Sequence, residues 1–159
     1  RNIFKKDDKE KIFNIESELS AYVEDIRLTD LSDHSLTIIP LYTTYKIIVT
    51  VNLRKNIKKC ILGIGFSTLE NVPLRTIWSK PQDLNKGRYE FILIEDKIFY
   101  SGKYQLHIGL TMAHGKIQLQ NLPNIMTIEF EEYIDSQIAF DSKSGLIINQ
   151  ADVEVRPIN

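Results

Sequence analysis

The 159 residues are 43% hydrophobic and 26% charged, which suits one folded domain with a hydrophobic core rather than two. The 20 basic and 21 acidic residues nearly cancel, so no strong field directs the chain to nucleic acid or to an anionic membrane. The single cysteine, Cys60, excludes an internal disulfide and fits a reducing compartment, and no apolar run approaches the ~20 residues of a membrane-spanning helix.

In chain order, residues 1–18 form a charged lead, which we interpret as a linker or an N-terminal arm because it holds few apolar residues. From residue 19 onward, short runs of alternating apolar and polar residues are separated by turn residues, and no long stretch has a helical period. The pattern predicts an all-β domain over residues 19–132. The expected strands are Tyr22 to Leu28, an edge piece from Leu36 to Ile39, Tyr45 to Leu53, Cys60 to Ser67, Leu74 to Ser79, Arg88 to Ile94, Tyr104 to Thr111 and Met126 to Phe130.

This number of strands, over roughly 110 residues, predicts an immunoglobulin-like antiparallel β-sandwich. One sheet is expected to contain the strands that begin at Leu74, Cys60, Tyr104 and Met126, with the Leu74 strand at its edge. The other sheet is expected to contain the strands that begin at Tyr22, Tyr45 and Arg88.

Residues 133–159 contain two more strand candidates, Gly145 to Asn149 and Ala151 to Arg156. These strands exceed what one sandwich needs. Extra strands pair either with an edge of their own sheet or with a neighbouring chain, and strand exchange is a low-cost route to a dimer. The predicted fold is therefore a β-sandwich with extra C-terminal strands.

The strands that begin at Cys60 and Tyr104 share an asymmetry, because bulky apolar residues alternate with small or polar residues in both. Successive side chains of a strand point to opposite faces, so the bulky set faces the core and the other set faces outward. Glycine inside a strand often marks a place where another group approaches the backbone, so the outward face predicts a shallow ligand-binding trough. The core-facing residues are Leu62, Ile64, Phe66, Tyr104, Leu106, Ile108 and Leu110. The outward residues are Gly63, Gly65, Ser67, Gln105, His107, Gly109 and Thr111.

Trp78 and Arg75 are the candidates for one side of the trough, and they lie on opposite faces of their strand. Trp78 is either a core residue or a ring that stacks on a sugar face, and Arg75 is the alternative occupant of the trough. His107 is an exposed strand residue, a hydrogen-bonding group for a ligand or, as a third alternative, a catalytic base.

The sequence contains no Gly-x-Ser-x-Gly, no His-Glu-x-x-His and no phosphate-binding glycine loop. The three histidines have no metal-ligand spacing, and the acidic residues do not form the pair that a glycosidase needs. We therefore expect a binding domain with no catalytic residue, no metal site and no cofactor.

Four stretches resemble, in the same order, the C-terminal domain of Wzt-type ATPases of bacterial polysaccharide ABC transporters. They are AYVEDIRLTD at 21–30, YKIIVTV at 45–51, ILGIGFS at 61–67 and IFYSGKYQLHIGL at 98–110. The resemblance covers roughly residues 20–132. Binding residues vary with the glycan in this family, so the candidate site residues depend on the alternation alone.

The resemblance implies an immunoglobulin-like sandwich that follows an ATPase domain and binds the end-modified O-antigen glycan of lipopolysaccharide. Binding at the cytoplasmic face licenses export through the transmembrane subunit of the ABC transporter. The resemblance further implies a homodimer that exchanges C-terminal strands, and a cytoplasmic location peripheral to the inner membrane. The full-length protein is then an ATPase.

The resulting prediction is a non-catalytic carbohydrate-binding domain that recognises the end of an O-antigen-type polysaccharide and does not bind nucleic acid. One alternative is a structural or adhesive sandwich that binds another protein through its sheet edge. The other is a sugar-modifying jelly-roll enzyme with His107 as its base.

Overall fold

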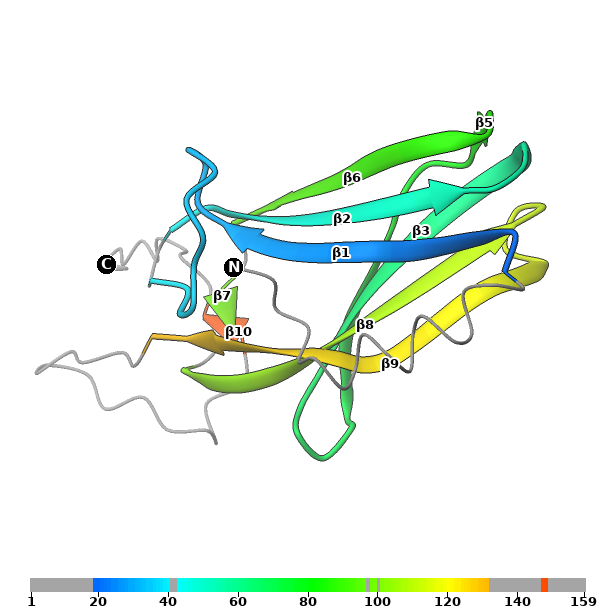
Figure 1. Ribbon diagram of the computed structural model, residues 1–159. Helices are drawn as coiled ribbons and strands as arrows, with labels where there is room; N and C mark the ends of the chain where they lie inside the picture. Colours follow the sequence, from blue (N-terminus) through cyan, green and yellow to red (C-terminus); the bar gives the residue numbers. More distant parts are fainter. Residues whose placement is uncertain (1–18, 41–42, 97, 100, 132–146, 149–159) are drawn as a thin grey trace, which may run out of the picture.

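Two antiparallel β-sheets lie face to face in the computed structural model (Figure 1), which describes residues 19–40, 43–96, 98–99, 101–131 and 147–148. One sheet has the order β1–β2–β6 and the other has the order β4–β3–β8–β9, with β5 also paired to β3. The described residues include no helix long and apolar enough to cross a bilayer. The strands are β1 Ala21–Thr29, β2 Tyr45–Leu53, β3 Ile57–Ser67, β4 Pro73–Trp78, β5 Gln82–Leu84, β6 Gly87–Glu95, β7 Ile98–Phe99, β8 Gly102–Met112, β9 Ile117–Phe130 and β10 Ile147–Ile148.

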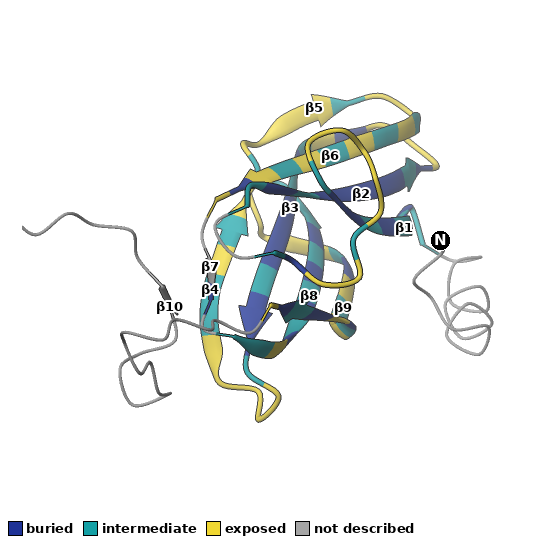
Figure 2. Cartoon of the chain, turned by 90° about the vertical axis from the view of Figure 1, so that its left-hand side faces the viewer, coloured by how far each residue is buried: buried dark blue, intermediate teal, exposed yellow. Residues whose placement is uncertain are grey.

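The all-β sandwich is confirmed, and so is the division of the main strands between the two sheets. Period-two alternation produces this arrangement, because each sheet buries one face against the other. Figure 2 shows β2 and β3 as largely buried strands and β4 and β6 as strands with exposed stripes. The seven residues expected to face the core from β3 and β8 are all buried, at 5% exposure or less.

Aromatic rings fill the core at the end where β8 begins. Phe99, Tyr104 and Phe130 contact one another with ring centroids 5.1 to 5.7 Å apart, and Phe66 and Tyr45 extend the cluster. Such separations are typical of favourable aromatic pairs. Phe99 is 1% exposed, so burial of this ring holds the two-residue strand β7 against the sandwich.

Several strand bounds differ from the expectation. β3 begins at Ile57 and β9 begins at Ile117, well before Met126. In β9 the alternation is interrupted, because Leu106 pairs with Met126 whereas Ile108 pairs with Leu122. Four residues of β9 therefore span two of β8, which is a bulge, and proline is tolerated within strands at such bulges.

The expected edge strand from Leu36 to Ile39 is wrong. Ile39 instead makes an isolated parallel bridge to Phe130, and its amide donates to the Glu129 carbonyl. The Glu131 amide donates to the Ile39 carbonyl and the Ile39 side chain is fully buried, so one bridge and core packing hold this segment without a continuous strand. The short strands β5 and β7 were not expected, because neither is long enough to show a period.

The C-terminal extension is described in part. β10, within the expected strand Gly145 to Asn149, pairs antiparallel with β7. The other expected strand, Ala151 to Arg156, and the lead at 1–18 lie outside the described residues. Strand exchange in a dimer stays a prediction.

Arg75 joins the two sheets at their open edge. Its Nη1 atom lies 2.5 Å from Oε2 of Glu95, which is 5% exposed at the end of β6. Arg75 comes from β4, so this ion pair connects the outer strand of one sheet to the outer strand of the other. Burial also raises the pKa of Tyr45, with a further contribution from the nearby Glu95 charge.

Replacing Arg75 with Met should lower the free energy of unfolding by about 2 to 3 kcal/mol, because the buried Glu95 carboxylate loses the guanidinium. The matched control is Arg27→Met, which removes the exposed pair between Arg27 and Glu90 and should cost less than about 1 kcal/mol. Urea unfolding followed by circular dichroism measures both values. A loss at Arg75 no larger than the loss at Arg27 would contradict the role of Arg75 between the sheets.

Candidate ligand-binding site

The outer face of the β4–β3–β8–β9 sheet carries two glycines in one cross-strand row. Gly63 pairs with Trp78 on one side and with Gly109 on the other, and Gly109 pairs with Asn121. Directly paired residues point to the same face, so Trp78 and Asn121 project outward on either side of the two glycines. Strands lie ~4.8 Å apart, so the Cα atoms of the two flanking residues are separated by roughly 14 Å, and the indole of Trp78 reaches over Gly63.

A cavity of about 300 Å³ lies on this face, beside all three glycines that were expected to open it. The next row places Thr76, Gly65 and His107 side by side, and these residues also line the cavity. We call this cavity the trough. Of the expected site residues, the structure brings Gly63, Gly65, Ser67, Trp78, His107 and Gly109 together in the trough.

The three glycines have different surroundings. A Cβ atom at Gly63 would lie 2.5 Å from Cζ3 of Trp78, so glycine is needed there to seat the indole ring. A Cβ at Gly65 would make ordinary contacts with His107 and Thr76. A Cβ at Gly109 would meet nothing within 4 Å, so Gly109 is the glycine that leaves the floor open.

Trp78 is 61% exposed and lies against the trough side of Gly63, so the core alternative for this residue is wrong. The expectation that Arg75 occupies the trough is wrong. Arg75 pairs with the buried residue Phe66, so its side chain points toward the inside of the sandwich. There it pairs with Glu95 and takes no part in the trough. A half-exposed aromatic ring beside an open floor suits contact with the C–H face of a sugar ring.

His107 is held by hydrogen bonds at both ring nitrogens. Nδ1 accepts from the backbone N–H of Asn124 at 3.1 Å, so the ring hydrogen resides on Nε2 and is donated to Oγ of Ser67 at 2.6 Å. The bulge in β9 brings the Asn124 amide to this position. Neither nitrogen is free to take a proton from a substrate, which argues against His107 as a catalytic base.

A hydrogen bond links two loops at one end of the trough. Nδ2 of Asn124 donates to Oδ1 of Asn71 at 2.9 Å, which connects the β9 bulge to the turn between β3 and β4. Both residues have a positive φ, 51° and 63°, which asparagine adopts more readily than most residues. The link crosses from one side of the trough to the other beside Ser67 and His107.

Six lining residues were not expected from the sequence: Phe66 and Ile108, which were assigned to the core, and Asn71, Pro73, Thr76 and Asn121. Thr76 lies on the same face of β4 as Trp78. Knowing which face of this strand points outward would therefore have identified Thr76 as a lining residue. Asn71 lies in a turn and Asn121 lies next to a bulge. At both places the sequence has no regular alternation of apolar and polar residues from which the direction of a side chain could be predicted.

Gln105 and Thr111 face outward as expected but do not line the trough. Within the described residues, Oε1 of Gln105 is buried without a hydrogen-bond partner. The Thr111 hydroxyl lies 3.5 Å from the Ile61 carbonyl, one row beyond Gly109. Both residues flank the trough at its ends.

As far as the chain is described, the lining contains hydroxyl, amide and imidazole groups and apolar surface, but no charged side chain. Among the described residues no three His, Cys, Asp or Glu side chains gather into a group suited to a metal ion. The arrangement therefore suits reversible binding of a polar, uncharged molecule.

No protein-family model matches the sequence, and no curated protein matches it. The fold does match a solved structure, "Crystal structure of the C-terminal domain of wzt", with a TM-score of 0.70. The two chains are 14% identical, and the match covers 87% of this chain and 86% of that chain. At this identity the match shows the fold, and it confirms at that level the resemblance expected from the sequence.

Gly63→Ala should displace the Trp78 ring, because the added methyl group would overlap the indole. Trp78 is the sole tryptophan, so its fluorescence maximum and intensity report the change directly. Gly109→Ala is the matched control and should leave the emission unchanged, because the methyl group enters open space. Circular dichroism checks that both variants are folded. Equal emission spectra for the two folded variants would contradict the packing of the Trp78 ring against Gly63.

Proposed function

We propose that this chain is a non-catalytic carbohydrate-binding domain and that the trough takes the end of an O-antigen-type polysaccharide. The observation that carries the proposal is the row of Trp78, Gly63, Gly109 and Asn121, which combines an exposed aromatic ring, an open floor and a polar wall. The likeness in fold to the C-terminal domain of Wzt supports it.

The hydrogen-bonded link between Asn71 and Asn124 at one end of the trough supports recognition of a chain end. A glycan that continued in both directions would run into the link between Asn71 and Asn124. A terminal sugar instead enters from the open side, with its C–H face on Trp78 and its hydroxyls near Ser67, Thr76 and Asn121. The site is shallow and open to water, so we expect a Kd in about the high-micromolar to millimolar range.

In the full-length protein we propose that this domain follows an ATPase domain and couples glycan recognition to export by an ABC transporter. The resemblance of the sequence to Wzt-type ATPases supports this context. On this proposal the protein lies in the cytoplasm, peripheral to the inner membrane through a transmembrane subunit. Two copies in a homodimer would raise the avidity for the polysaccharide.

A sheet-edge protein interface is a second candidate function, favoured by apolar residues on β6. Ile92 and Ile94 are 53% and 61% exposed, and among the described strands β6 pairs only with β2. Phe91 and Leu93 on its other face line an apolar hollow of about 220 Å³ next to Ile77. An exposed apolar strand edge is a common site of strand addition.

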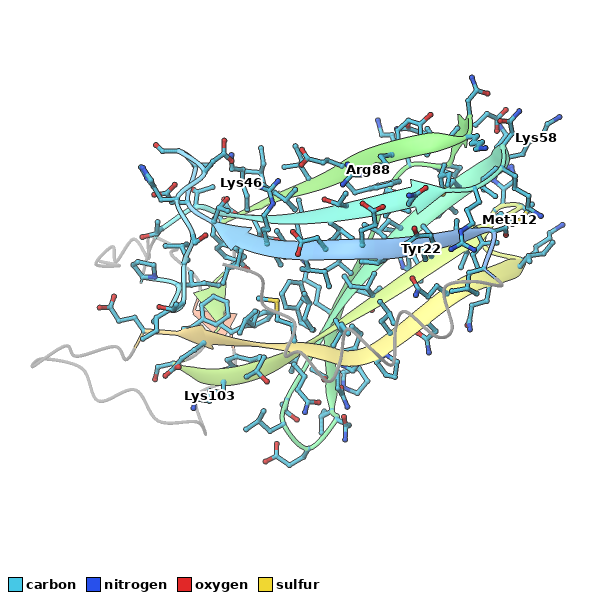
Figure 3. All side chains as sticks on the ribbon, in the orientation of Figure 1. Tyr22, Lys46, Lys58, Arg88, Lys103 and Met112 are labelled. Atoms are coloured by element: carbon cyan, nitrogen blue, oxygen red, sulfur yellow. The ribbon has the colours of Figure 1, made fainter. Side chains whose placement is uncertain are left out.

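Gly109→Leu should abolish glycan binding and leave the fold intact, because the side chain fills the floor of the trough without touching the core. Lys103→Leu is the control, on the same strand and the same face about 20 Å away; Lys103 and Met112 mark the two ends of β8 in Figure 3. Amide NMR shifts during titration with the O-polysaccharide of the source strain measure binding. Shifts confined to residues outside β3, β4 and β8, or equal affinity of the two variants, would overturn the site.

Ile92→Lys combined with Ile94→Lys should weaken self-association if the second candidate is correct, because two charges would enter an apolar interface. Sedimentation equilibrium measures the association constant. The exposed replacement Ser35→Lys, in the turn after β1, is the control. Unchanged association in the double variant would exclude β6 as the contact between copies.

A further inference from the structure

We propose that the trough selects an uncharged sugar residue and discriminates against sugars that carry a carboxylate or a phosphate; this inference rests on the proposed function. Neither the fold nor the likeness to a solved structure determines the charge of the ligand. The chemistry of the lining side chains carries the argument.

Among the residues that the structure describes, no lysine, arginine, aspartate or glutamate lines the trough. The nearest cation in sequence, Arg75, is turned to the other face of β4 and paired with Glu95. The nearest acid in sequence is Glu70, which precedes Asn71. An anionic ligand would therefore meet only neutral donors and no compensating positive charge.

His107 does not supply a positive charge in this arrangement. Its Nδ1 atom accepts the N–H of Asn124, so it carries no hydrogen. In the imidazolium form both ring nitrogens are donors, and the Nδ1–H group of His107 would then face the backbone N–H of Asn124. The observed contacts therefore require the neutral ring.

A carboxylate or phosphate that enters the trough loses part of its hydration without gaining an ion pair. Transfer of an unpaired charge out of water costs far more than transfer of a hydroxyl that finds a hydrogen-bond partner. Sugar hydroxyls find such partners at the exposed side chains of Thr76 and Asn121, and the C–H face of the ring covers Trp78. The volume of about 300 Å³ lies at the lower limit of small-molecule sites, which suits one or two sugar residues.

The test compares each neutral methyl glycoside of glucose, galactose and mannose with its own uronic acid, by amide NMR titration at one ionic strength. We expect at least one neutral glycoside to bind with shifts at Gly63, Gly65 and Gly109, and its uronic acid to bind at least tenfold more weakly. A uronic acid that binds as tightly as its neutral counterpart would overturn the selectivity and leave the proposed function standing. Absence of binding by all the glycosides and by the O-polysaccharide would overturn the proposed function, and this inference with it.

Asn121→Lys provides a gain-of-function test, because it places an ammonium group on the wall beside Gly109. The variant should reduce the preference for the neutral glycoside at least tenfold by strengthening binding of the uronic acid. Asn121→Gln changes the length of the side chain without adding charge and should keep the preference of the native chain, whatever its effect on affinity. An unchanged preference in Asn121→Lys would show that the ligand does not sit between Asn121 and Trp78, and would overturn the inference.

Discussion

The register of β3 against β8 is the constraint on which the trough depends. Burial of alternate apolar residues such as Leu62 and Ile108 determines that register, since a shift by one residue would expose the whole set. Once the register is set, Gly63 must lie opposite Gly109 on the outer face. The open part of the floor, at Gly109, is therefore set by the same register as the core beneath it.

The two flanking strands supply the walls, and each is held by contacts away from the ligand. β4 carries Trp78 and is held by the Arg75–Glu95 ion pair and by the Ser79 hydroxyl, which accepts the amide of Leu62. β9 carries Asn121, and its bulge presents Asn124 to His107. The inner face of the sheet thus provides stability and the outer face provides the binding surface, so changes on the outer face alter binding with little effect on the fold.

Much of the architecture was predictable, because strand alternation is a local property of the sequence. The run that begins at Tyr104 alternates cleanly and the run that begins at Tyr45 alternates except at Ile48, and their core faces and sheets were assigned correctly. β9 was predicted only from Met126, because the bulge at Pro123 interrupts its period. The turn residue Asn71 was missed, since its role arises from a hydrogen bond to a distant strand.

By itself the sequence determined where the main strands lie, though not all their ends, and also which side of β3 and β8 is buried and where small residues collect. Only the tertiary structure decided that Trp78 rather than Arg75 faces the trough, that Gly63 is covered by the indole and that Gly109 is open. The physical reason is that a period of two specifies the two faces of a strand but not its neighbours. Those neighbours depend on pairing between segments far apart in the chain, and the chemistry of the site is a property of the neighbours.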